Sequence, residues 1–130
     1  LEKSRNQVIP FSDGAEENLI NYVRQYGPPT GVIAYNDVRA LQAKQILARF
    51  QLTPPEDYAL IGFDNRLSFM AGELPLTTFD YSLEEMGRKA AGLLLAVMKG
   101  KGRTRKKIVV TPRFIERASC GPSPHLKGGS

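Results

Sequence analysis

The segment ALIGFDN, residues 59–65, is a short apolar run that ends abruptly in an acid and an amide. The segment GVIAYND, residues 31–37, repeats this arrangement earlier in the chain. Both runs are typical of strands buried in a parallel sheet, where apolar residues continue along the strand instead of alternating with polar ones. In such sheets ligands bind beyond the carboxyl ends of the strands. The ends of the two runs are therefore predicted to form two sides of one crevice.

Strand and helix patterns alternate along the rest of the chain. Asp13 followed by Glu16, and Ser82 followed by Glu85, have the spacing of helix-capping pairs. This order predicts an α/β fold, a parallel sheet with helices on both faces. Helices are expected after Asp13, over 36–50 and over 83–99; strands or extended segments are expected over 7–11, 31–35, 59–63, 75–81 and 107–117.

Length and composition indicate one ordinary folded domain. The chain has 130 residues, of which 42% are hydrophobic and 24% charged. Its longest apolar run, Ala90–Met98, is far shorter than the ~20 residues of a membrane span. The single Cys120 allows no internal disulfide, which favours a reducing, cytoplasmic location. The start LEKSRNQ does not resemble a signal peptide, but it also lacks a methionine, which leaves export open.

The net charge of +5 comes from one short segment. Between Lys99 and Lys107 the chain has only basic charges, and the remainder is nearly neutral. Aromatic residues that could stack on bases do not interleave this run, so we interpret it as a solvated loop and not as a nucleic-acid site.

Catalytic patterns are missing from the sequence. The single histidine, His125, lies in the predicted tail, and no histidine has a spacing that would activate Cys120. No group of residues has the spacing of metal ligands, and no glycine-rich phosphate loop occurs. Asp57, Asp64 and Asp80 each fall at a turn or strand end, where a carboxylate has a structural use. We therefore expect no enzyme activity, no catalytic residues, no metal and no cofactor.

The polar residues after the two apolar runs have two interpretations. Asn and Asp are preferred helix N-caps, so Asn36 and Asp64 could simply satisfy the free N–H groups of helices that follow them. The repetition of the pattern at the same end of two strands instead favours contact with a polar ligand. One residue can serve both purposes.

Three segments in register resemble one protein family. PPTGVIAYNDVRALQAKQIL, LTPPEDYALIGFDN and LPLTTFDYSLEEMGRKAAGLLL are similar in order and spacing to the effector-binding domain of LacI/GalR bacterial transcription regulators. The resemblance covers about residues 12–122. It implies part of a type I periplasmic-binding-protein-like fold, mostly its C-terminal lobe, with a small metabolite such as a sugar held between two lobes.

The resemblance also implies roles for individual residues. Asn36 and Asp64 match ligand-contacting positions, Phe11 falls near an aromatic ligand contact, and Leu83 falls at the crossover that lines the pocket floor. Residues 1–122 would then form the effector-binding portion, with the helix and basic loop at 83–107 belonging to the other lobe and 123–130 forming a tail. An arginine that many members use would lie upstream of Leu1, and the DNA-binding helix-turn-helix domain is not in this chain.

Assembly is predicted from two apolar surfaces. On helix 36–50, a stripe of Ala40, Ala43, Leu47 and Phe50 should face the sheet, opposite Gln42, Gln45 and Arg49. Val38 and Leu41 fall on the polar side; scattered apolar residues often have no role, but in the resembling family this surface contributes to a homodimer interface. The loop after Arg66 would join it through Leu67, Phe69 and Met70.

The helix at 83–99 carries a second apolar stripe, Leu83, Met86, Ala90, Leu94 and Val97. We expect this stripe to be covered, either by its own lobe or by exchange with another chain. For the whole protein, a transcription regulator is preferred. An exported solute-binding protein of the same fold and a free-standing interaction module are the alternatives.

Overall fold

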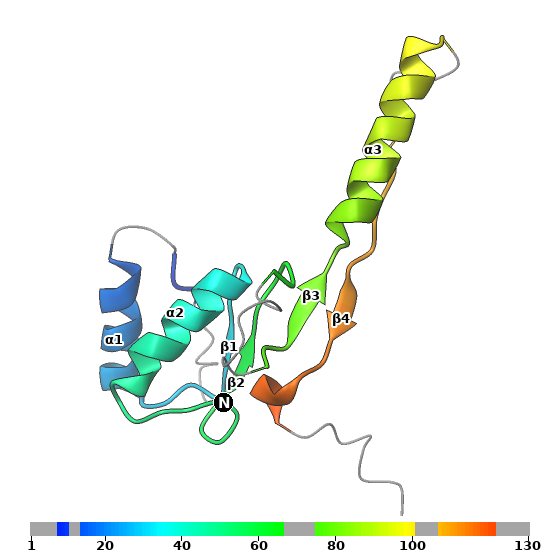
Figure 1. Ribbon diagram of the computed structural model, residues 1–130. Coiled ribbons are helices and arrows are strands. Elements are labelled where there is room, and N and C mark those ends of the chain that lie inside the picture. The colour runs from blue at the N-terminus through cyan, green and yellow to red at the C-terminus, as the bar shows by residue number, and fades with distance from the viewer. Residues whose placement is uncertain (1–7, 11–13, 67–74, 101–106, 122–130) are drawn as a thin grey trace, which may run out of the picture.

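The computed structural model describes residues 8–10, 14–66, 75–100 and 107–121. It has a compact body and a projecting arm (Figure 1). The body holds helices α1 (Ala15–Tyr26) and α2 (Asp37–Ala48) and strands β1 (Gly31–Ile33) and β2 (Ala59–Ile61). Strands β3 (Thr78–Asp80) and β4 (Arg113–Ile115) lead into and out of the arm, which is helix α3 (Leu83–Met98); the short 3-10 helix η2 (Ala118–Cys120) follows β4.

The strands form a continuous but mixed arrangement. β1 and β2 are parallel, with Gly31 opposite Ala59. A parallel bridge between Ile61 and Thr77 extends this pairing towards β3. β3 and β4 are antiparallel, with Phe79 opposite Phe114. The predicted parallel sheet is thus present from β1 to the start of β3, whereas the return strand β4 is antiparallel.

The strands are shorter than predicted because their ends bend towards the loops. β1 ends at Ile33 and β2 at Ile61, although Ala34 N–H still donates to the Ile61 carbonyl at 2.8 Å. The expected strand over 7–11 is wrong for residues 8–10, which have no regular structure; Pro10 lacks the N–H that a ladder needs. In the described part of the segment after residue 106, only Arg113–Ile115 is a strand, beginning after Pro112.

Helix α2 provides the side chains that cover the sheet. Ala40 and Leu47 are fully buried and Ala43 is buried, as the helical spacing predicted. Gln42, Gln45 and Arg49 are exposed on the opposite side. The same core contains Leu19 and Val23 of α1 together with Tyr58, Leu60 and Leu76.

Only one face of β1 is covered within the described residues. Val32 and Ala34 pack against the core, whereas Ile33 and Tyr35 are each 82% exposed. Among the described residues, the core therefore lies on the Val32 side of this strand, and the Ile33 side is exposed.

The helix ends follow local chemistry. Ser82 caps α3, since its Oγ accepts from Glu85 N–H at 3.3 Å, as predicted. The predicted cap of α1 is wrong in position: its N-cap is Gly14, at φ +100°, with no side-chain cap bond, and Asp13 lies outside the described residues. Gly27 ends α1 at φ +80° and its N–H donates to the Val23 carbonyl at 2.9 Å.

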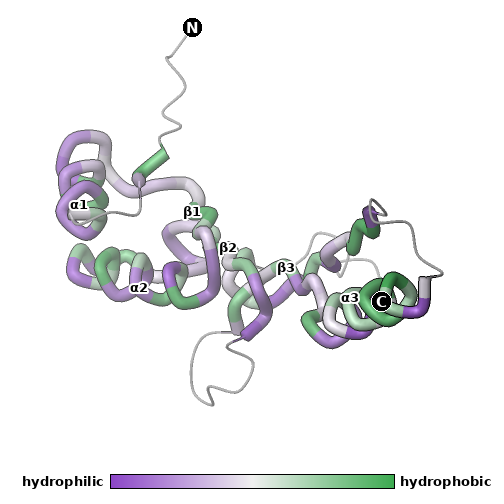
Figure 2. Tube along the Cα trace, turned by 90° about the horizontal axis from the view of Figure 1, so that it is seen from above, coloured by the Kyte–Doolittle hydropathy of each residue, from purple (hydrophilic) through white to green (hydrophobic). Residues whose placement is uncertain are grey.

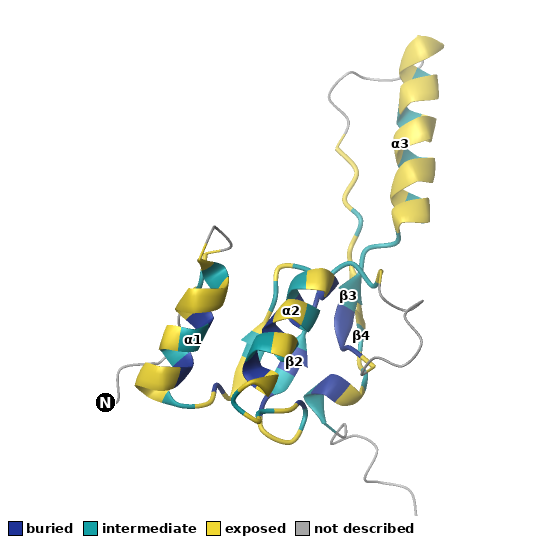
Figure 3. Ribbon diagram, turned by 60° about the vertical axis from the view of Figure 1, so that its left-hand side comes forward, coloured by how far each residue is buried: buried dark blue, intermediate teal, exposed yellow. Residues whose placement is uncertain are grey.

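Helix α3 projects away from the body instead of folding back on it (Figures 1 and 3). None of its residues is buried, and its stripe is exposed, with Leu94 62% accessible. Figure 2 shows that much of this helix is hydrophobic. The described residues of the body therefore do not cover the apolar stripe of α3. That another chain covers this stripe stays a prediction.

Candidate functional site

The loops that follow β1 and β2 lie side by side at the carboxyl edge of the sheet. Asp37 N–H donates to the Phe63 carbonyl at 2.9 Å, which joins the start of α2 to the end of the β2 segment. Asp64 N–H donates to the Phe79 carbonyl at 2.9 Å, which joins the same segment to β3. Asn36 and Asp64, predicted from separate sequence segments, are therefore held on adjacent loops.

Asn36 is the N-cap of α2. Its backbone is extended at φ −154° and its Oδ1 accepts from Arg39 N–H at 2.9 Å, so the capping interpretation is correct. The cap fixes the amide group at the edge of the sheet. Its Nδ2 remains a donor group, and this is the part of Asn36 best suited to an external ligand.

Asp64 and its neighbour have unusual backbone conformations. Asp64 has φ +103° and Asn65 has φ +53°, both in the region that favours glycine. Holding a non-glycine residue there costs on the order of 1–3 kcal/mol and is common at binding sites. The two strained residues lie where the ligand contact was predicted.

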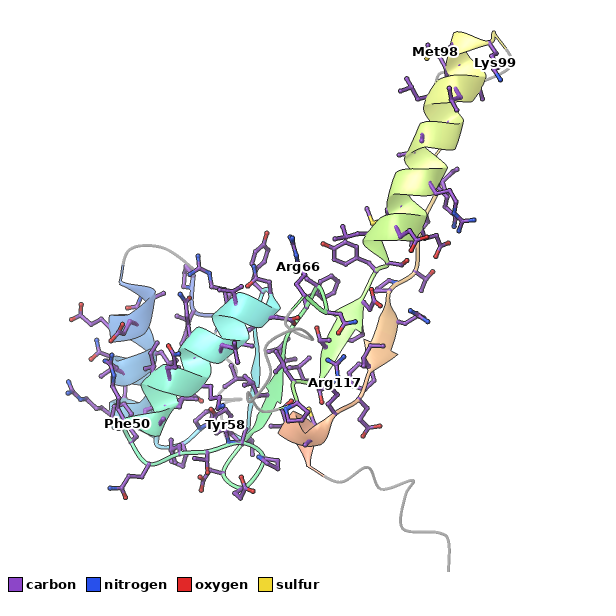
Figure 4. The ribbon with its side chains drawn as sticks, viewed as in Figure 1. Phe50, Tyr58, Arg66, Met98, Lys99 and Arg117 are labelled. Atoms are coloured by element: carbon purple, nitrogen blue, oxygen red, sulfur yellow. The ribbon has the colours of Figure 1, made fainter. Side chains whose placement is uncertain are left out.

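Tyr81 lies close enough to Asp64 to be affected by its charge, which the sequence did not reveal. Burial raises the pKa of the Tyr81 phenol, and the charge of Asp64 and a hydrogen bond with its side chain raise this pKa further. The Arg66 guanidinium acts in the opposite direction, and Tyr35 also contributes to the shift. Figure 4 shows Arg66 beside the first turn of α2. These four side chains therefore share one small region at the sheet edge.

Asp37, the first residue of α2, is a buried acid to which the sequence pattern assigned no role. It is 3% exposed, and its carboxylate accepts from Thr78 Oγ1 at 2.6 Å and from Arg66 N–H at 2.9 Å. It thus joins α2, the loop after β2 and β3. Gly62 lies against it, and a Cβ there would collide with the Asp37 carboxylate.

A polar network connects the Asp64–Asn65 turn with the strands that lead to the arm. Asn65 Oδ1 accepts from Arg117 Nη2 at 2.7 Å, and Asn65 Nδ2 is 3.4 Å from Asp80 Oδ2. Arg113 Nη2 donates to the same Asp80 oxygen at 3.3 Å. The bond from Ser82 N–H, with smaller effects of Asn65 and Arg113, lowers the pKa of Asp80. Arg117, labelled in Figure 4, also donates to the Leu76 carbonyl at 2.7 Å.

Aromatic rings pack beside this network. Phe63 stacks on Phe79 and on Tyr81, each with ring centroids 5.7 Å apart. Phe79 also meets Phe114 of β4 at 5.1 Å. The rings fix the end of the β2 segment against β3.

The other predicted residues do not join the site in the described structure. Leu83 begins α3 and is 54% exposed; Val38 is 49% exposed on α2, and Leu41 is half-buried. Outside the described residues lie Phe11, Leu67, Phe69 and Met70. The structure therefore brings together Asn36 and Asp64 from the predicted set.

Across residues 8–10, 14–66, 75–100 and 107–121, no three His, Cys, Asp or Glu side chains cluster in a way that could hold a metal ion. Within these same ranges, none of the helices has both the length and the apolar character needed to cross a membrane.

Known proteins resemble both the sequence and the fold. Residues 3–120 match the family model of the periplasmic binding protein-like domain. An arabinose metabolism transcriptional repressor from Halalkalibacterium halodurans is 30% identical over 105 residues, which is 77% of this chain and 28% of that protein. The chain therefore spans less than a third of this relative.

Two solved structures share the fold. A LacI family transcriptional regulator from Arthrobacter sp. FB24, in complex with lactose, has a TM-score of 0.71 and 28% identity, covering 81% of this chain and 40% of the regulator. A LacI family regulator from Enterococcus faecium with bound ribose also has a TM-score of 0.71 and 28% identity, covering 88% and 42%. The chain thus matches less than half of each of these structures.

Proposed function

The chain belongs to the periplasmic binding protein-like family, within its LacI/GalR branch, and from this premise we propose that it is the ligand-sensing lobe of a bacterial transcription regulator. In this proposal the ligand is a small metabolite, a sugar, and it controls operator binding through a DNA-binding domain outside these 130 residues. The similar proteins are regulators, which favours this function over transport by an exported solute-binding protein and over an enzyme. The proposal places the protein in the cytoplasm.

The observation that carries the proposal is the pairing of Asn36 and Asp64 at the carboxyl edge of the sheet. The Asn36 Oδ1 is committed to Arg39 N–H, so this residue offers mainly the donor Nδ2. Asp64 offers carboxylate acceptors. Neighbouring sugar hydroxyls suit such a pair, because each hydroxyl can both donate and accept. The lactose and ribose bound to the similar regulators support this ligand class.

A thermal-shift screen tests the proposed function. Protein expressed from the complete reading frame is screened with neutral sugars, nucleobases and phosphorylated metabolites, because a ligand that binds only the folded state raises the melting temperature. We expect a neutral sugar to raise it, and a matched operator-binding assay to respond to that sugar. A shift that only nucleobases produce would contradict the sugar assignment.

We further propose that the regulator is a homodimer that uses the α2 surface around Val38 and Leu41. Val38 is 49% exposed although it is apolar, which supports a covered surface. The predicted partners Leu67, Phe69 and Met70 lie outside the described residues. Val38→Asp should shift the molar mass measured by light scattering towards a monomer, whereas Asn18→Asp at an exposed position of α1 should not.

The arm offers a second route to assembly in the 130-residue chain. Its exposed α3 stripe would be buried if two chains exchanged their arms. Light scattering of the isolated chain should then give a dimer that Leu94→Asp dissociates and Val38→Asp does not. A monomer at all concentrations would rule out exchange.

A further inference from the structure

We infer that Arg117 is a positioning residue of the proposed ligand site: it holds the Asn65 side chain, and through Asn65 it fixes the turn that presents Asp64 before a ligand binds. This inference rests on the proposed function, because it concerns the same site. It assigns a role to an arginine 52 residues away from Asn65 in the chain, which no sequence motif indicated.

The backbone of Arg117 is fixed by a buried residue. Arg117 lies just before η2 (Figure 4). Its N–H donates to Thr77 Oγ1 at 2.9 Å, and its carbonyl accepts from the same hydroxyl, also at 2.9 Å. Thr77 is fully buried, and its backbone forms a parallel bridge with Ile61 at the end of β2. The Arg117 side chain therefore projects from a part of the backbone that the sheet holds in place.

The guanidinium group of Arg117 joins two segments. Nη1 donates to the Leu76 carbonyl and Nη2 donates to Asn65 Oδ1, each at 2.7 Å. A guanidinium is a rigid planar fork, so two bonds made by its two ends fix the direction of both acceptors. The Asn65 side chain is thus held in a defined position relative to the segment that leads into β3.

The turn at Asn65 needs such a hold because its backbone is unfavourable. Asp64 has φ +103° and Asn65 has φ +53°. Residues other than glycine keep such conformations only where the surrounding structure holds them. Arg117 fixes the carbonyl end of the Asn65 amide, and the other end of that amide, Nδ2, is 3.4 Å from Asp80 Oδ2. The side chain of Asn65 therefore has a partner at each end.

The backbone on either side of Asn65 is fixed as well. Asp64 N–H donates to the Phe79 carbonyl and Arg66 N–H donates to the Asp37 carboxylate, each at 2.9 Å. None of these bonds uses the Asp64 carboxylate. The turn is therefore set while this carboxylate keeps its capacity to accept from a ligand, and a group that is positioned beforehand loses less freedom on binding.

Hydrogen–deuterium exchange detects the hold on the turn without any ligand. Protein from the complete reading frame is followed by mass spectrometry that resolves single amides. Arg117→Lys keeps the positive charge and loses the fork, so the Asp64 and Arg66 amides should open locally and exchange faster. The reference is the Ala34 amide, which donates to the Ile61 carbonyl at 2.8 Å. Exchange at Asp64 should accelerate about 10-fold more than exchange at Ala34, as expected for the loss of a hydrogen bond from a charged donor.

Two further variants accompany this measurement. Asn65→Gly removes the acceptor of Arg117 but suits a positive φ, so it should accelerate exchange at Asp64 in the same way. Arg49→Lys alters an exposed ion pair with Glu16 and is the control, which should leave exchange at Asp64 unchanged. Equal acceleration at Asp64 and Ala34 in Arg117→Lys, no acceleration at Asp64, or an Asp64 amide without protection in the wild type overturns the inference.

Calorimetry measures the consequence for binding. Lactose, D-ribose and L-arabinose are the probes, and each variant is studied at a temperature at which circular dichroism shows it to be folded. Arg117→Lys should weaken the affinity for the sugar that binds by about 10-fold. Asn65→Gly should weaken it similarly, and the double variant should bind no more weakly than Asn65→Gly, because Arg117 acts through Asn65. A purely structural role would lower the melting temperature and leave the affinity of the folded protein unchanged.

The outcomes separate the inference from the proposed function. Unchanged affinity in folded Arg117→Lys overturns the positioning role, and so do losses in Arg117→Lys and Asn65→Gly that add fully in the double variant. A wild-type protein that binds none of the three sugars refutes the proposed sugar-sensing function. In that case the exchange measurement still decides whether Arg117 holds the turn.

Discussion

Replacing the buried Asp37 by alanine should destabilise the fold more than any other single loss of an acid at the sheet edge. The carboxylate is 3% exposed and accepts from Thr78 Oγ1 at 2.6 Å and Arg66 N–H at 2.9 Å. Two hydrogen bonds are lost and hydrogen bonds to charged groups contribute about 1.5–3 kcal/mol each, so Asp37→Ala should cost about 3–6 kcal/mol. Total stabilities of domains are only about 5–15 kcal/mol, so this loss is large.

The assay is urea denaturation followed by far-UV circular dichroism. Asp57→Ala is the control, because Asp57 is exposed and accepts from Thr53 N–H at a surface turn; it should cost less than about 1.5 kcal/mol. Thr78→Val completes a double-mutant cycle, in which the coupling with Asp37 should be about 1–3 kcal/mol. Equal losses in Asp37→Ala and Asp57→Ala, or additive effects of Asp37 and Thr78, would refute the reasoning.

Three further predictions concern the body and its junction with the arm. Tyr58 is 2% exposed, its hydroxyl has no hydrogen-bond partner among the described residues, and burial raises its pKa to about 12. The neutral phenol therefore contributes fully to the free energy of unfolding below pH ~10, and this contribution is lost as the pH rises through about 12. Tyr58→Phe should be at least as stable at pH 7, and its melting temperature should not show this alkaline decrease. Gly62→Ala places a Cβ against Asp37 and 2.9 Å from Leu76 Cδ2, and urea denaturation should show a loss of about 1–3 kcal/mol, whereas the exposed Gly87→Ala should show none. Because the pKa of Asp80 is lowered in the folded state, its carboxylate contributes stability that is present above pH ~4 and is lost as the pH falls further. The melting temperature of Asp80→Asn should therefore fall less steeply with decreasing pH than that of the wild type. An equal fall in both proteins would contradict the network.

Local patterns in the sequence predicted the parts of the fold that depend on neighbours along the chain. The buried side of α2 follows from helical spacing, and Asn36 and Ser82 act as caps because their side chains reach N–H groups three residues ahead. The meeting of Asn36 and Asp64 follows from the rule that parallel strands end at one edge.

Contacts between distant residues could not be read in this way. Asp37 bonds to Thr78 across 41 residues, and Tyr81 stacks on Phe63 because β3 lies beside the segment after β2. The sequence showed an acid at position 37 and a tyrosine at position 81, but not the alignment that joins them to these partners. The positive φ of Asp64 could not be predicted either. A glycine at this position would have suggested a left-handed backbone, whereas an aspartate does not.

The apolar stripe of α3 shows a different limit. Helical periodicity predicted the stripe, but a periodic pattern does not specify what covers it. In the structure the arm projects from the body with its stripe exposed, so burial depends on a partner and not on the local sequence.

Titration calorimetry with Asp64→Ala and Asn36→Ala tests the central claim most directly. The ligand is the neutral sugar that gives the largest thermal shift. Loss of a charged acceptor from a binding site costs about 2–5 kcal/mol, so Asp64→Ala should weaken binding by about 30-fold or more, and Asn36→Ala should weaken it to a smaller extent. Asp57→Ala should bind as the wild type does. Sugar affinity that survives both Asp64→Ala and Asn36→Ala would show that the ligand binds elsewhere and would contradict the proposed site.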